Sequence, residues 1–477
     1  MAAKDAGSVM GPGSGPGVGP LASEEADGLD ATQQPRKKSY GAGARILTIG
    51  IASTGILSFA YLALASRELN SVDYGHVSLL WSIAFVILSV IYRPIEQLLS
   101  RTIADRRARG LAGHPLRTPA LIQAAFALIF LVAALALRTT IENDLFDGSS
   151  TLYWILVIAV MAYAGSYFAR GWLAGHEQFA AYGGLVLLES TSRFLFAVAA
   201  VVGITSGQSA IALGIAVAPF VSLSVVPFAI GKFGPGAASA GADAELEREL
   251  PVLDAAGEGP AHAEIEEAAN DLSLRHGSGF AIAVFLIMLS EQTLMNASVL
   301  IVQHDSGPAL AGFVFNVLLI VRAPLQLFQA VQTSILPHLT GLEARENSGE
   351  FARAIRVTVL AISGFAGLCA LGLLAIGPWV MTTVLGDKGF TYQRGGLALV
   401  AVGMGFHLVA GTLNQAALAR SRARLAAFAW LLSAVLFVAW VASSVITDVV
   451  LRVETGYAGA AFILCCLLYA LYRRPAD

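Results

Sequence analysis

Long apolar stretches, separated by short polar connections, recur along almost the whole chain. An α-helix needs a run of about 18–25 predominantly apolar residues to cross a bilayer. We count twelve such runs, and they predict helices over 43–66, 76–99, 118–137, 151–172, 181–204, 209–231, 279–302, 309–336, 355–377, 395–416, 424–446 and 455–472. The pattern therefore predicts an all-α membrane protein that crosses the bilayer about twelve times.

The connections between these runs alternate between basic and base-poor ones. Clusters of arginine follow the second span, within 101–117, and the tenth span, within 420–424. The connections in between, such as Ile141–Asp147 and Gly386–Phe390, contain few bases. Because short basic loops stay in the cytosol, the alternation supports twelve spans and predicts that both termini are cytosolic.

The longest connection, 232–277, separates two groups of six spans. It is rich in Ala and Gly and is acidic, so we expect a flexible cytosolic linker that only joins the halves or also binds a partner. Because six is even, both halves enter the membrane in the same orientation, as parallel repeats do. The predicted division is a disordered cytosolic tail, an N-terminal lobe, the linker, a C-terminal lobe and a short cytosolic tail, over 1–42, 43–231, 232–277, 278–472 and 473–477.

A polar stripe runs along the eighth apolar span. Arg322, Gln326, Gln329 and Thr333 recur at helical spacing, so they share one face of a helix. A charge that faces lipid at mid-bilayer costs about 2.5–3.5 kcal/mol on insertion scales. We therefore expect the stripe to face protein or a water-filled cavity.

The second span carries a related segment, since Arg93-Pro-Ile-Glu-Gln-Leu resembles Arg322-Ala-Pro-Leu-Gln-Leu. A guanidinium offers five donors in a planar fork that matches phosphate oxygens, so Arg93 and Arg322 are candidate substrate ligands. The alternatives are a cap on helix carbonyls or an ion pair between helices. The side chains of Gln326 and Gln329 can form hydrogen bonds with sugar hydroxyls or, equally, with neighbouring helices.

Carboxylates also fall within the predicted spans. Glu189 and Arg193 stand four residues apart and can pair within one helix, unless Arg193 serves the cavity. Glu291 has no basic neighbour in the sequence. We expect Glu291 to be the counter-ion of an arginine such as Arg322 or a site for a coupling cation, H⁺ or Na⁺, and Glu96 has the same alternatives.

Composition agrees with a membrane protein and argues against an enzyme. Charged residues make up 13% of the chain, against about 25% in soluble proteins. The three cysteines lie inside predicted spans without metal-ligand spacing, and the chain has no phosphate-binding loop, zinc-protease or nucleophile-elbow motif. We therefore expect no catalytic site, no cofactor or metal, and no nucleic-acid partner.

Three segments of the chain point to a known family. They are Ala169–Gly175 followed by Phe179, Tyr182, Glu189 and Arg193; then Ala65–Gly75; and then Arg322–Pro337. These segments resemble bacterial polysaccharide flippases of the multidrug/oligosaccharidyl-lipid/polysaccharide (MOP) exporter superfamily. The first is similar to the family's helix four to five region, the second to its link between helices one and two, and the third to its helix eight. In the second segment Asn70 and Ser71 replace the family's Gly and Pro. The resemblance extends over about 43–472.

The resemblance implies two six-helix lobes around a cavity that opens alternately to the cytosol and to the outside. It implies a polyprenyl-(pyro)phosphate-linked oligosaccharide as cargo, turned to the outer leaflet of a bacterial plasma membrane for cell-surface polysaccharide assembly. Membrane lipids and polysaccharide assembly proteins are the other expected partners. The alternatives are a cation-coupled exporter of drugs or small molecules from the same superfamily, and a polytopic polysaccharide polymerase or ligase, against which the short outside loops argue.

Overall fold

The computed structural model describes residues 50, 52–108, 116–224, 226–227, 260–344 and 348–474. Within these ranges the side chains of 105, 107–108, 260–281, 326–327, 329–344 and 348 are not described. The predicted tail 1–42 and most of the predicted linker therefore lie outside the described residues.

The described part of the chain consists of helices and short connections without any strand, and each predicted span overlaps one helical segment. The first half contains a helix over 52–68, then α2 (Ser71–Ile87), η1 (Leu88–Tyr92), α3 (Arg93–Ala108), α4 (Arg117–Ala136), α5 (Arg138–Thr140), η2 (Ile141–Leu145), α6 (Ser150–Gly175), α7 (Phe179–Val201) and α8 (Gln208–Leu223). The second half contains α11 (Pro260–Ser306), α12 (Pro308–Ala344), α13 (Ser348–Leu385), α14 (Arg394–Ala419), α15 (Ala423–Ala442) and α16 (Val449–Arg473).

Ten helices of the described residues are long and apolar enough to cross a membrane, and α8 is a shorter apolar helix. The protein is thus a multi-pass membrane protein, and the predicted all-α fold is confirmed. The largest difference from a predicted boundary is at α11, which begins at Pro260 and makes the last part of the predicted linker helical.

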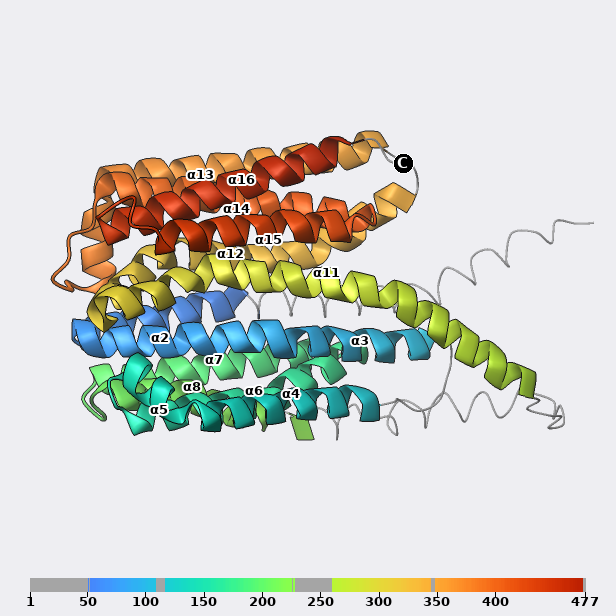
Figure 1. The fold of residues 1–477 in the computed structure, drawn as a ribbon, viewed down its shortest axis with the longest axis horizontal. Helices are drawn as coiled ribbons and strands as arrows, with labels where there is room; N and C mark the ends of the chain where they lie inside the picture. Colours follow the sequence, from blue (N-terminus) through green and yellow to red (C-terminus); the bar gives the residue numbers. More distant parts are fainter. Residues whose placement is uncertain are drawn as a thin grey trace, which may run out of the picture.

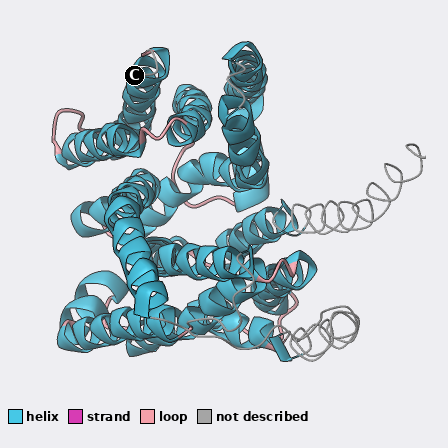
Figure 2. Cartoon of the chain, turned by 90° about the vertical axis from the view of Figure 1, so that its right-hand side faces the viewer, coloured by secondary structure: helices cyan, strands magenta, loops and turns pink. Residues whose placement is uncertain are grey.

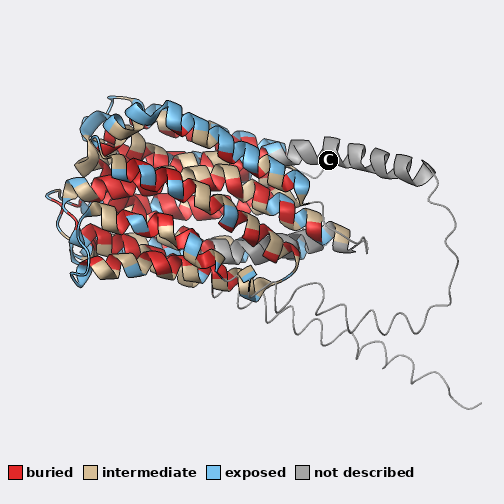
Figure 3. Ribbon diagram, turned by 90° about the horizontal axis from the view of Figure 1, so that it is seen from below, coloured by how far each residue is buried: buried red, intermediate tan, exposed pale blue. Residues whose placement is uncertain are grey.

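The helices form two bundles that lie side by side (Figures 1 and 2). One lobe contains α2 to α8 and the other contains α11 to α16, and the lobes meet where α2 and η1 pack against α11 and α12. Buried residues line the inside of both bundles, while exposed ones cover the periphery (Figure 3). On α13 the large apolar side chains of Leu360, Leu368 and Leu371 are more than half exposed, as suits a helix that faces lipid.

A π-helical turn joins α2 to α3. Pro94 has no backbone N–H, and its ring would clash with the carbonyl of Val90 in a regular helix. The chain widens over Leu88–Tyr92, where the Arg93 N–H bonds to the Leu88 carbonyl. Such turns are frequent at functional sites, and this one ends directly before Arg93.

We call the end of the bundle that carries the base-poor connections the outer end. Side chains cap three helices that begin there, namely Asn70 for α2, Ser149 for α6 and Asp448 for α16. The Asn70 Oδ1 accepts hydrogen bonds from the Val72 and Asp73 N–H groups at 3.0 and 2.9 Å. Asn70, a departure from the pattern of the resembled family, therefore still starts the second helix.

Candidate functional site

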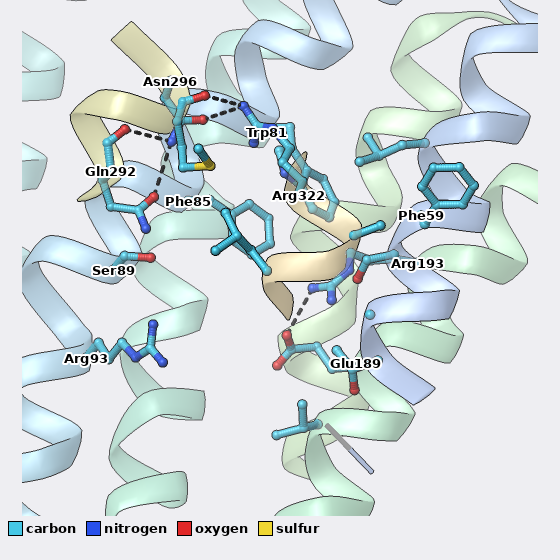
Figure 4. A pocket seen from close by; sticks show the side chains of 18 of the residues that line it. Phe59, Trp81, Phe85, Ser89, Arg93, Glu189, Arg193, Gln292, Asn296 and Arg322 are labelled. Carbon is cyan, nitrogen blue, oxygen red and sulfur yellow. Dashed lines mark hydrogen bonds and ion pairs between the residues drawn. The ribbon is translucent and has the colours of Figure 1, made fainter. Parts of the chain in front are cut away.

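A cavity of about 290 Å³ lies between the two lobes (Figure 4). The helix over 52–68, α2, η1, α3, α6 and α7 line one side of it, and α11 and α12 line the other. Helix α2 begins with Ser71 at the outer end and continues through η1 into α3. Along these three elements the residues that line the cavity run from Trp81 to Glu96. The cavity therefore extends from the middle of the bundle towards the inner, predicted cytosolic, end.

Ionisable side chains from both lobes line this cavity. Four are arginines and three are glutamates: Arg93, Arg170, Arg193, Arg322, Glu96, Glu189 and Glu291. With all seven ionised, the lining carries one net positive charge. The sequence predicted all of them as site residues except Arg170.

Three of these charges form a buried cluster in the N-terminal lobe. Glu189 accepts a hydrogen bond from Arg193 Nη1 at 2.9 Å and one from Arg170 Nη2 at 2.5 Å. The Arg193 guanidinium also donates to the hydroxyls of Tyr163 and Ser190. The predicted pair of Glu189 and Arg193 is confirmed, and both side chains are about 2% exposed.

The sequence assigns Arg170 no role of its own beyond its place in the segment Ala169–Gly175. The structure instead places it within α6, buried and paired with Glu189. The sequence does indicate a polar face of this helix, because Tyr163, Ser166, Tyr167 and Arg170 follow a helical spacing, but it does not indicate the partner of Arg170.

Arg322 binds the backbone of its own lobe. Its Nη2 donates to the Met295 carbonyl at 2.8 Å and to the Asn296 Oδ1 at 2.9 Å, both on α11 (Figure 4). The guanidinium carbon lies 4.2 Å from the centroid of the Phe315 ring. Arg322 therefore caps a helix carbonyl, which is one of the alternatives that the sequence left open. Within the described residues it forms no ion pair with Glu291.

Arg93 differs from the other three arginines. No described residue forms a hydrogen bond or ion pair with it, although it interacts electrostatically with Glu96 and Glu291, and its side chain stands on the cavity wall (Figure 4). Its neighbour Glu96 already accepts a hydrogen bond from the Tyr182 hydroxyl at 2.7 Å. The guanidinium fork of Arg93 thus remains available to an anion in the cavity.

Glu291 lines the cavity and also a smaller pocket of about 50 Å³ in the C-terminal lobe. His407, Asn414 and Trp430 line the same pocket. The His407 Nδ1 lies 3.1 Å from the Tyr457 hydroxyl, while its buried Nε2 has no partner in the described part of the chain. Gln326 and Gln329 lie on α12, but their side chains are outside the described set, so their roles stay predictions.

Comparison with known proteins relates the chain to transporters through its fold. No family model and no curated protein matches the sequence. A structure described as the inward-facing conformation of a multidrug resistance MATE family transporter of the MOP superfamily is 11% identical, with a TM-score of 0.61, and the match covers 90% of this chain and 97% of that one.

Two further structures agree with this likeness. A mutant of the Vibrio cholerae MATE transporter VcmN is 13% identical with a TM-score of 0.56, covering 91% of this chain and 97% of that one. The MATE transporter ClbM in complex with Rb⁺ is 14% identical with a TM-score of 0.55, covering 91% and 95%. At such identities the likeness establishes a common fold, which is the fold that the resemblance implied.

Proposed function

We propose that the protein is a transporter that turns a lipid-linked oligosaccharide with a phosphate or pyrophosphate headgroup across a bacterial plasma membrane by alternating access. One observation carries this proposal. Arg93, which forms no hydrogen bond or ion pair with a described residue, faces a net positive cavity between two lobes whose fold is that of transporters. On this proposal the protein makes and breaks no covalent bonds.

The charge distribution favours an anionic cargo. Moving a phosphate headgroup through hydrocarbon would remove its hydration at prohibitive cost, so a protein must supply replacement donors. Arg93 can supply two parallel hydrogen bonds to phosphate oxygens. The three arginines with partners raise the positive potential around it without losing their own contacts.

The position of the cavity favours loading from the cytosolic side. It lies in the inner part of the bundle, and the lobes are in contact at the outer end, where α2 packs on α12. A headgroup could enter between the lobes while its lipid tail remains in the bilayer. Enzymes that assemble the polysaccharide would then receive the cargo outside.

A cation-coupled exporter of drugs or small molecules is the second candidate, and the fold supports it equally. Glu291 favours it, since this carboxylate adjoins a pocket with His407 and could carry H⁺ or Na⁺. A cationic drug would also need free carboxylates in the cavity. Glu189 and Glu96 are occupied by two arginines and by Tyr182, which disfavours this reading.

A reconstituted-vesicle assay tests the flippase proposal. It measures how fast an inward-facing polyprenyl-pyrophosphate oligosaccharide becomes accessible from outside. We expect Arg93→Ala to lower the initial rate at least tenfold and Arg93→Lys to restore part of it, because charge is kept and the bidentate fork is lost. Arg138→Ala is the matched control, since Arg138 is an exposed arginine of an outer loop, away from the cavity.

Equal rates for Arg93→Ala and the wild type would contradict the role of Arg93. A wild type that translocates none of a range of lipid-linked glycans, but accumulates a cationic dye when a proton or sodium gradient is imposed, would favour the exporter.

A further inference from the structure

The two lobes meet at the outer end in a seam that lies apart from the cavity. Gly75 on α2 packs directly on Pro308 at the start of α12, where a Cβ on Gly75 would come within 2.0 Å of the Pro308 carbonyl oxygen. Gly312, one turn further along α12, lies against the Gly75 backbone as well. Glycines at this crossing therefore allow the two helices to approach more closely than other residues would.

On one side of the seam the N-terminal lobe caps a helix of the C-terminal lobe. Helix α13 ends at Leu385, and the last carbonyls of a helix lack intrahelical partners and carry partial negative charge. The Arg67 Nη1 donates to the Thr383 carbonyl at 2.7 Å, and the Ser66 Oγ donates to the Leu385 carbonyl at 2.6 Å.

On the other side the capping runs in the opposite direction. The Lys388 Nζ, in the loop that follows α13, donates to the Leu69 carbonyl at 2.6 Å, directly after the helix over 52–68. The same ammonium lies 5.2 Å from the centroid of the Tyr74 ring. Each lobe thus supplies a cation that caps the end of a helix in the other lobe.

A buried amide links the two sides. The Asn316 side chain is fully buried on α12; its Oδ1 accepts from the Tyr74 hydroxyl at 2.6 Å, and its Nδ2 donates to the Ser66 Oγ at 2.9 Å. Both partners belong to the N-terminal lobe. Separation of the lobes at this end would leave these groups unpaired until water reached them.

We propose that the seam is the outer gate of the transporter and that the exchanged helix caps of Arg67 and Lys388 are its latch. The inference rests on the proposed alternating-access function. Contacts of this kind suit a gate, because water at the membrane surface can replace cation–carbonyl hydrogen bonds when the lobes separate. An interface of apolar side chains would instead expose its full area to water on opening.

Distances between spin labels on the two lobes test the latch. The labels are placed at Thr205→Cys and Thr447→Cys, two exposed outer-loop positions, in a protein whose native Cys369, Cys465 and Cys466 are replaced by Ala. We expect Arg67→Met and Lys388→Met each to raise the ratio of open to closed molecules about tenfold, since a net loss of about 1.4 kcal/mol is tenfold. Arg67→Lys should restore most of the closed population.

Arg138→Met is the matched control, because Arg138 is also an outer-loop cation, but the residues that it contacts, Glu142, Ser150, Tyr153 and Trp154, all belong to its own lobe. A wild-type distance distribution in the double variant Arg67→Met, Lys388→Met would overturn the latch, whatever the vesicle assay shows. An opened seam without translocation of lipid-linked oligosaccharide would support the latch and refute the cargo. Thermal unfolding equal to that of Arg138→Met confirms that the variants remain folded.

Discussion

Replacing Glu189 by Gln should destabilise the protein more than replacing either arginine that it binds. Glu189 is about 2% exposed, and it is the carboxylate to which both Arg170 and Arg193 are paired. Its replacement leaves two buried cations without a counter-ion, and breaking a buried pair in this way costs about 3–5 kcal/mol. Arg170→Gln leaves a neutral pair of Glu189 and Arg193, and removes one charged hydrogen bond worth about 1.5–3 kcal/mol.

The free energy of unfolding can be compared by urea denaturation of the purified proteins in a mild detergent, with tryptophan fluorescence as the signal. Glu142→Gln is the control, since it removes a carboxylate of an outer-loop ion pair, with Arg138, and should unfold like the wild type. The reasoning is refuted if Glu189→Gln costs no more than Arg170→Gln. That result would mean that water in the cavity, rather than the carboxylate, solvates the two guanidinium groups.

One further prediction concerns the outer seam. Gly75→Ala places a methyl group against the Pro308 backbone, so we expect longer spin-label distances and a loss of about 1–3 kcal/mol in the free energy of unfolding. Gly184→Ala is the control, because its methyl group would meet no atom within 4 Å and should change neither quantity. Unaltered distances in Gly75→Ala would contradict the tight crossing of the two helices.

The sequence predicted the spans well because each span depends on a local property, the length of an apolar run. It also predicted the pair of Glu189 and Arg193, whose four-residue spacing on one helix is sufficient for contact. It missed Arg170, whose partner lies on another helix. Contacts between helices depend on how the helices rotate and cross, and no spacing in a single segment reports that.

Charges that bind backbone carbonyls were the hardest to predict. For Arg322 the sequence left a substrate contact, a carbonyl cap and an ion pair open, and the structure shows that it binds the Met295 carbonyl and Asn296. Arg67 and Lys388 were unremarkable members of short connections, but they cap helices that are more than 300 positions away in the chain. A carbonyl acceptor exists at every residue, so the sequence contains no pattern that marks its partner.

The π-helical turn at Leu88–Tyr92 has a further mechanical consequence. It accommodates one more residue than an α-helical turn would, and each residue of an α-helix corresponds to a rotation of about 100° and a rise of about 1.5 Å. Pro94 prevents the turn from relaxing into a regular α-helix, since its ring would then clash with the Val90 carbonyl. The extra residue therefore fixes the rotation of α3 relative to α2 at about 100° from that of an unbroken helix. Arg93, the first residue of α3, is held on the cavity wall by this fixed rotation.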